Sequence, residues 1–264
     1  MSEAVFTSEP RWRDRLAGLR GLVLPLLALV AWNAMAHRGD VHAYVFVPLE
    51  LVGQALLQAL ADGELWRSWT ASLGRTGAGL LMGSVAGISL GAVMAVWKLA
   101  DRLISPIYHA IRQVPVLGYI PLISLWVGNG EPSKLFVISL AAFYPTVLNT
   151  YEGVKNADAR HLAVGRIFLA NRWQTLRYIT LPGALPSIVT GLLQAVAFAW
   201  LSSIGSELFF NPGPGLGNLM LNGQAAFRME VVVMAVGVIG VTGFLTTKVV
   251  TLAAGHLLRW RSVR

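Results

Sequence analysis

The chain of 264 residues is rich in apolar side chains and poor in charge. Hydrophobic residues make up 55% and charged residues 13%, against roughly 25% charged in soluble domains, so we exclude an ordinary soluble domain and predict one all-α membrane domain. The chain has no cysteine and a net charge of +8; disulfides and cysteine nucleophiles are excluded, and we attribute the basic excess to membrane topology rather than to nucleic acid.

Six apolar runs predict about six transmembrane helices, since a helix needs about 20 apolar residues to cross the hydrocarbon core. We expect them over residues 21–36, 71–97, 113–127, 134–151, 187–210 and 231–252. Pro25 falls in the first turns of the first run, which a helix tolerates. The third run is short and holds Pro115 and Pro121, so a broken or re-entrant helix is expected there.

The segments between these runs also carry predictions. An amphipathic piece over residues 49–61 is expected to lie along the membrane interface. Residues 99–112 are expected to form a short intracellular connection, and residues 211–218 a turn-rich loop. Glycines spaced by four residues in the second run favour tight helix packing, and Arg75 near its start is expected to snorkel to the interface.

The basic residues indicate which side of the membrane each loop faces. Of the 21 Lys and Arg residues, 15 lie in the two tails and in the loops after the second and fourth runs, which places those segments in the cytoplasm. We therefore divide the chain into a cytoplasmic tail (1–20), a transmembrane domain (21–258) with a cytoplasmic loop (157–182), and a second tail (259–264). A bacterial inner membrane is the expected location.

The cytoplasmic loop is too long for a simple connection between two spans. From Asp158 to Gly191 it holds four arginines and one acid, with apolar residues at helical spacing, and we expect it to bind a soluble partner. Pro182 and Pro186 are expected to break its last helix.

The end of this loop resembles a known pattern. Ile179, Leu181 and Pro182 match the coupling loop of binding-protein-dependent ABC-transporter permeases, whose motif is Glu-Ala-Ala, a later Gly, and then Ile-x-Leu-Pro. The segments 45–95 and 111–150, with a Trp-x-Gly-x-Gly-Glu turn at 126–131, resemble the nitrate, sulfonate and taurine subfamily. The resemblance covers roughly residues 45–260.

The resemblance implies a type I ABC importer-like fold and a transporter in which different subunits form the pathway, hydrolyse ATP and deliver the solute. Two permease copies form the pathway, two ATPase subunits bind the coupling loops with ATP and Mg, and an extracytoplasmic binding protein delivers a small anionic solute such as an aliphatic sulfonate, taurine or nitrate. The chain has no Walker-type glycine loop of its own, so no cofactor and no catalytic residue are expected in it. The implied ATPase-coupling residues are Ala163, Val164, Gly165, Leu169, Ala170, Asn171, Arg172 and Trp173.

The motif is incomplete in its first half. Ala163, Val164 and Gly165 hold the Glu-Ala-Ala place, which removes a charge that caps or anchors the coupling helix. Leu169 holds the Gly place, where backbone freedom or close approach is usual. We expect coupling to persist through a more apolar helix.

Polar residues within the spans are candidates for a translocation path. Glu207 is costly inside a membrane and is either functional or a packing anchor at the outer interface. Serines there serve equally well as interhelical hydrogen-bond partners. The candidate set is Gln113, Trp126, Gln194, Ser202, Ser206 and Glu207. The histidines are scattered without metal-site spacing, so no metal site is expected.

Other functions stay open at this stage. A secondary transporter is one alternative, although inverted repeats and midplane charges are not evident. An ABC permease for another solute, such as a pyrimidine or an aromatic acid, is a second. A membrane enzyme is a third, but converging nucleophile, base or metal ligands are absent from the spans.

Overall fold

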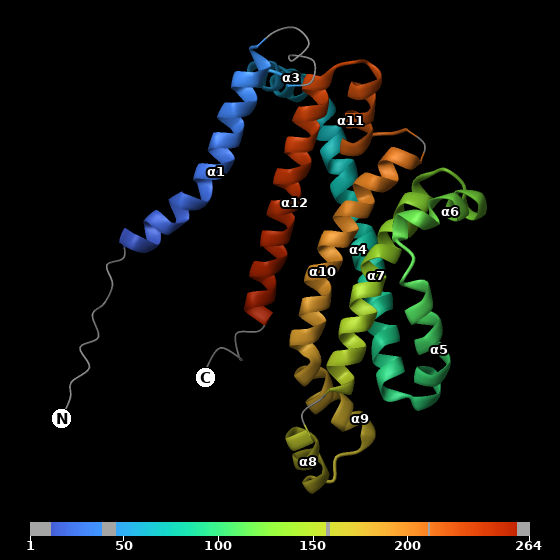
Figure 1. The fold of residues 1–264 in the computed structure, drawn as a ribbon. Helices are drawn as coiled ribbons and strands as arrows, with labels where there is room; N and C mark the ends of the chain where they lie inside the picture. The colour runs from blue at the N-terminus through green and yellow to red at the C-terminus, as the bar shows by residue number, and fades with distance from the viewer. Residues whose placement is uncertain (1–11, 39–45, 157–158, 211, 258–264) are drawn as a thin grey trace, which may run out of the picture.

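The computed structural model describes residues 12–38, 46–156, 159–210 and 212–257, and these residues are helical with short connections. Three long helices run side by side through the centre (Figure 1): α4 (Glu64–Val96), α7 (Glu131–Lys155) and α10 (Leu181–Phe209). α7 packs against both of the others. This trio forms the frame on which the remaining elements are placed.

Small residues allow α4 and α7 to approach closely. Gly79, Gly83, Gly87 and Gly91 of α4 all face α7, and a methyl group added at Gly91 would lie 2.5 Å from the Val147 carbonyl oxygen. Each of these positions therefore excludes a side chain. The predicted packing role of the glycine spacing is confirmed, because four-residue spacing puts all four on one helix face.

The fifth predicted span is longer than expected, because its prolines do not break it. α9 (Arg172–Thr175), a π-helical turn (Leu176–Thr180) and α10 follow one another, and together they run as a single helix over Trp173–Phe209. In the π-helical turn the Leu181 N–H bonds to the Leu176 carbonyl, five residues back. The wider turn accommodates Pro182, which has no N–H to donate and whose ring clashes with an α-helical carbonyl.

The third predicted span is misplaced along the sequence. Residues 99–112 were expected to be a connection, but α5 (Lys98–Ile111) is a helix that packs on α4. The chain then turns by 89° into a 3-10 turn (Val116–Tyr119) and α6 (Ile120–Val127). Pro115 sits at this elbow and Pro121 in the first turn of α6. The predicted break is confirmed, but the helix before it carries most of the length.

Among the described residues, three helices are long and apolar enough to cross a membrane: Glu64–Val96, Trp173–Phe209 and Met229–His256. The bent pair Lys98–Ile111 and Val116–Val127 makes a fourth if it counts as one span. The expected six are thus not all identified by length and apolarity. α7 is long enough but less apolar, consistent with its position between α4 and α10.

The end of the bundle that carries α6 is closed by short helices. α3 (Leu49–Ala61) has the predicted bounds and lies across the bundle (Figure 1), burying Ala55 and Ala59. α11 (Leu216–Ala225) packs between α10 and α12 (Met229–Leu257). Part of the predicted loop over 211–218 is therefore helix. The sequence pattern missed α11 because its glycines and asparagines are typical of turns.

α1 (Trp12–Ala36) stands apart from the central trio in Figure 1. It is attached through its last turns, where the Trp32 indole donates to the Val47 carbonyl at 2.9 Å and the Leu49 N–H donates to Asn33 Oδ1 at 3.3 Å. The helix begins earlier than predicted, so Pro25 lies in its interior.

Candidate functional site

The loop singled out by its sequence folds into two short helices beyond the ends of α7 and α10 (Figure 1). α8 spans Ala159–Ile167 and α9 follows after a tight turn. The Ala170 N–H bonds to the Gly165 carbonyl at 3.0 Å, and the Leu169 N–H to the Arg166 carbonyl at 3.1 Å. This pair of bonds is the Schellman ending of a helix, whose C′ residue is usually glycine.

Leu169 occupies that C′ position with a φ of +52°. A side chain in this left-handed conformation costs about 1–2 kcal/mol through contact of Cβ with the following carbonyl. The glycine of the family pattern is therefore explained by backbone conformation. Here leucine replaces it and projects outward, with 90% of its surface exposed.

α9 begins with a reciprocal cap. The Gln174 N–H donates to Asn171 Oδ1 at 2.8 Å, and the Asn171 N–H donates to Gln174 Oε1 at 2.9 Å. Two backbone donors that the helix leaves unpaired are thereby satisfied. Asn171, chosen from the sequence as a coupling residue, acts within the structure as the helix cap.

The loop is also fastened to the span that follows it. A methyl group added at Gly165 would lie 2.6 Å from Ile179 Cδ1, so Gly165 of α8 packs directly on the π-helical turn. Ile179, Leu181 and Pro182 are half-buried at the start of α10. These residues form the junction between the loop and the span and not its outer surface.

The tip of the loop carries an exposed apolar surface, which we call the apolar tip. It consists of Ile167, Phe168, Leu169 and Trp173, each between 65% and 90% exposed. Contiguous exposed apolar side chains of this size mark interaction surfaces. Ala163 and Ala170 flank it, whereas the side chains of Val164 and Arg172 lie outside the described residues. The sequence prediction omitted Ile167 and Phe168, although three consecutive large apolar residues in a basic loop are a usable signal.

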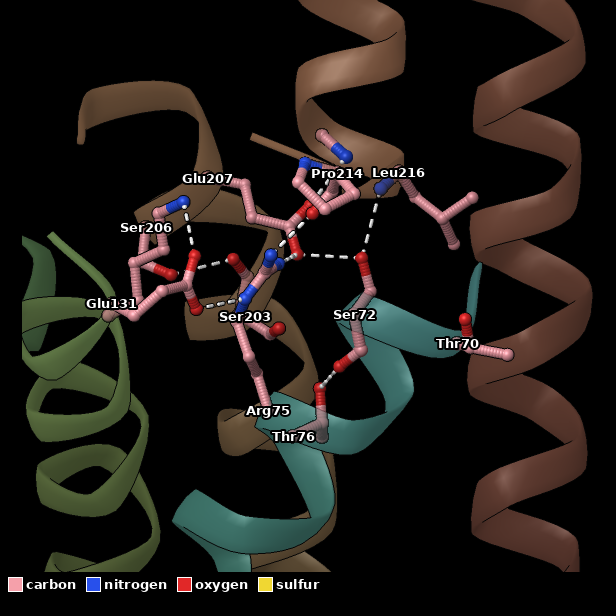
Figure 2. A network of polar contacts seen from close by, with 12 residues as sticks. Thr70, Ser72, Arg75, Thr76, Glu131, Ser203, Ser206, Glu207, Pro214 and Leu216 are labelled. Carbon is pink, nitrogen blue, oxygen red and sulfur yellow. Dashed lines mark hydrogen bonds and ion pairs between the residues drawn. The ribbon is translucent and has the colours of Figure 1, made fainter. Parts of the chain in front are cut away.

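A network of buried polar contacts (Figure 2) lies beside α11, at the opposite end of the bundle from α8 and α9 (Figure 1). Glu207 of α10 is completely buried, and its carboxylate accepts from Ser72 Oγ at 2.6 Å, from Arg75 Nη1 at 2.5 Å and from the Gly217 N–H at 2.7 Å. The Gly217 N–H belongs to the first turn of α11, whose positive end favours a carboxylate. Glu207 therefore anchors α4, α10 and α11 to one another.

The expectation that Arg75 snorkels to the interface is wrong. Its side chain is 8% exposed and also donates to Glu131 Oε2 at 2.6 Å and to the Pro214 carbonyl. Lys134 Nζ reaches the other Glu131 oxygen at 3.1 Å. Each guanidinium nitrogen has an acceptor, so this group, the Arg75 network, contributes rigidity and offers nothing to a solute.

The candidates for a translocation path separate into two groups. Gln194 and Ser202 line a cavity of about 400 Å³ between α7, α10 and the elbow that follows α5. Ser206 and Glu207 are fully buried by protein, and the Ser206 hydroxyl donates to the Ser203 carbonyl at 2.8 Å. Gln113 is exposed beside the cavity, and Trp126 is 75% exposed on α6. In the parts of the chain that the structure describes, no group of three metal-ligating side chains converges.

These features define a multi-span membrane protein whose helices are extended on one side by a rigid, apolar-tipped loop. The family described as "Binding-protein-dependent transport system inner membrane component" matches residues 83–261. The chain therefore belongs to this family of inner-membrane permeases.

Individual relatives agree with this assignment. The chain is 30% identical to the taurine transport system permease protein TauC of Escherichia coli K12, over 93% of this chain and 91% of TauC. It is 30% identical to the nitrate import permease protein NrtB of Leptolyngbya laminosa (75% and 70%). It is 26% identical to the bicarbonate transport system permease protein CmpB of Synechococcus elongatus (94% and 93%).

The fold has a counterpart among solved structures. A chain of the MetNI methionine ABC transporter, in a structure of its inward facing conformations, matches with a TM-score of 0.62 at 18% identity, covering 74% of this chain and 96% of that one. The type I importer fold expected from the sequence is confirmed. The chain is the non-catalytic permease of an ABC importer, in the group with taurine, sulfonate, nitrate and bicarbonate permeases, which decides against a secondary transporter or a membrane enzyme.

Proposed function

We propose that this chain is the membrane subunit of an ATP-driven importer for a small oxyanion: an aliphatic sulfonate, taurine, nitrate or bicarbonate. The apolar tip is the observation that carries the proposal, since it is an exposed apolar surface on a segment that continues directly into a membrane span. The names of the relatives support the solute class. ATP and Mg²⁺ are handled by the partner ATPase, and a binding protein delivers the solute on the outer side.

The physical basis of coupling is the rigidity of the loop. α8 is closed by the Schellman bonds, α9 by its reciprocal cap, and α9 continues through the π-helical turn into α10. A movement imposed on the apolar tip by closure of an ATPase is then transmitted to α10 as a rigid-body movement. A flexible loop would absorb the same movement.

The orientation and assembly follow from the same proposal. The loop with α8 and α9 lies in the cytoplasm, as the distribution of basic residues indicates. α1 starts and α12 ends toward the end of the bundle that carries α8 and α9 (Figure 1), which is consistent with both termini in the cytoplasm. Two copies of this chain with two ATPase subunits make up the transporter, in which α1, α4, the α5–α6 pair, α7, α10 and α12 are the six crossings of each copy.

Cysteine crosslinking tests the docking surface directly, because the natural chain has no cysteine. Phe168→Cys and Trp173→Cys are to be crosslinked to single cysteines on a co-expressed ATPase of the same transport system. Trp126→Cys is the matched control, being equally exposed but on α6 at the other end of the bundle. We expect crosslinks from positions 168 and 173 only. Crosslinks from none of the three, or equal yields from all, would rule out the apolar tip as the coupling surface.

A further inference from the structure

The cavity beside Gln194 and Ser202 lies near the middle of the long helices. It is lined by Ala141, Tyr144, Pro145 and Leu148 of α7 and by Gln194, Phe198, Leu201 and Ser202 of α10. On both helices these positions recur at three- and four-residue spacing, so a single face of each helix forms the wall. Residues 112 and 114–117 of the elbow close the third side.

The elbow brings a charge into this cavity. Arg112 is the C-cap residue of α5, and its side chain lines the cavity. Its Nε is buried and has no hydrogen-bond partner, and no carboxylate of the described chain forms an ion pair with it. Tyr108 is a described favourable contact: its ring centroid lies 5.8 Å from Cζ, and its side chain is within hydrogen-bonding reach of the guanidinium. A cation held inside the membrane region without a counter-ion is costly and is expected to serve function.

Further donors face the same space. The Tyr144 hydroxyl is buried and makes no hydrogen bond of good geometry among the described residues, although the Tyr119 side chain lies close to it. Gln194 Oε1 accepts from Asn149 Nδ2 at 3.1 Å, which leaves the Gln194 amide N–H groups available to a ligand. The cavity thus combines one guanidinium and two neutral donors with apolar walls from Val116, Leu117 and Phe198.

We propose that this cavity binds the oxyanion group of the transported solute, with Arg112 as its counter-ion and Tyr144 and Gln194 as further hydrogen-bond donors. A guanidinium presents parallel N–H groups that match two oxygens of a sulfonate, nitrate or bicarbonate. The apolar walls accommodate a short aliphatic tail. This inference rests on the proposed function for the solute class, but the site is defined by residues that are separate from the ATPase-docking surface.

Thiol labelling tests the site without requiring transport or an ATPase. Ser202→Cys is introduced into the purified full-length chain, and its rate of labelling is measured with 2-sulfonatoethyl methanethiosulfonate and with its cationic trimethylammonioethyl counterpart. Both reagents form a mixed disulfide and release methanesulfinate, and the first is itself an aliphatic sulfonate. Trp126→Cys, exposed outside the cavity, supplies the reference ratio of the two rates.

At position 202 we expect the ratio of the anionic to the cationic labelling rate to exceed the reference ratio by about tenfold. This factor corresponds to the free energy of a modest charge-assisted hydrogen bond. Arg112→Gln is expected to abolish the preference and Arg112→Lys to retain most of it. Ethanesulfonate is expected to slow the anionic labelling, whereas choline is not. Leu201→Cys, at a cavity-lining position that supplies no proposed donor, repeats the measurement if Ser202→Cys does not fold.

Either of two results would overturn the inference. One is that neither cavity position is labelled; the other is that Arg112→Gln leaves the preference for the anionic reagent unchanged. Failure of the proposed function looks different. Loss of crosslinking at the apolar tip with an intact anion preference at Ser202→Cys contradicts the coupling surface and leaves the anion site standing.

Discussion

Two arginines near the spans show how the same side chain serves two purposes. Arg75 is enclosed by the carboxylates of Glu131 and Glu207 and by the Pro214 carbonyl, so its charge is neutralised and it joins α4, α7, α10 and the loop before α11. Arg112 lines a cavity with its Nε unpartnered. Burial alone therefore does not identify a functional charge. The decisive property is whether the protein itself supplies the counter-ion.

The largest effect is expected from removing the cation of the Arg75 network. Arg75→Met leaves Glu207 buried without its counter-ion and should lower the free energy of unfolding by about 3–5 kcal/mol. Denaturant titration of the solubilised chain measures this. Arg67→Met on the same helix is the control, because Arg67 is exposed. Equal stability of the two variants would show that the network contributes no more than a surface charge.

A smaller loss is expected at Ser72, which both donates to Glu207 at 2.6 Å and accepts from the Leu216 N–H at 2.9 Å. Ser72→Ala should lower the free energy of unfolding by about 2 kcal/mol, since a hydrogen bond to a charged group is lost and a buried N–H is left unpaired. Thr70→Ala, on the exposed side of α4, is the matched control. An effect at Ser72 no greater than that at Thr70 would contradict the role of the bridge.

Arg112 should show the reverse pattern, affecting transport more than folding. In the assembled transporter Arg112→Gln is expected to raise the half-saturating concentration for uptake of a taurine, nitrate or bicarbonate substrate by about tenfold, equivalent to about 1.4 kcal/mol. The unfolding midpoint should stay near that of the natural chain. Arg112→Lys should recover most of the uptake. Unchanged uptake in Arg112→Gln, or a stability loss like that of Arg75→Met, would remove the distinction between the two arginines.

The smallest effect concerns strain rather than charge. Leu169→Gly should relieve the left-handed backbone strain and stabilise the end of α8 by about 1 kcal/mol, seen as slower hydrogen exchange of the amides of residues 169 and 170. Leu169→Ala keeps a Cβ and should give no such gain. If both variants weaken docking of the ATPase alike, the leucine side chain contributes to the apolar tip. If Leu169→Ala stabilised the end of α8 as much as Leu169→Gly, the backbone at position 169 would not be strained by its side chain.

Several features followed directly from sequence because they are encoded locally. Apolar length predicted the spans containing α4, α10 and α12, and periodicity predicted α3 with its bounds. The four-residue glycine spacing predicted the face of α4 that contacts α7. The position of Leu169 in the family pattern pointed to a turn of the loop where the backbone adopts a left-handed conformation. Each of these depends on residues within a few turns of one another.

Other features depend on residues far apart along the chain, and only the tertiary structure decided them. Arg75 meets Glu131 and Glu207 across 56 and 132 positions, and no periodicity specifies that pairing. Arg112 was expected in a cytoplasmic connection, but the 89° elbow after α5 places its side chain in the wall of a cavity. The π-helical turn before Pro182 likewise departs from the expectation that a proline breaks a helix, since the turn packs against Gly165 and the helix continues through it into α10. Sequence determined which long segments are helical and apolar; the contacts between them determined that Arg75 holds the fold together and that Arg112 lines a cavity without a carboxylate partner among the described residues.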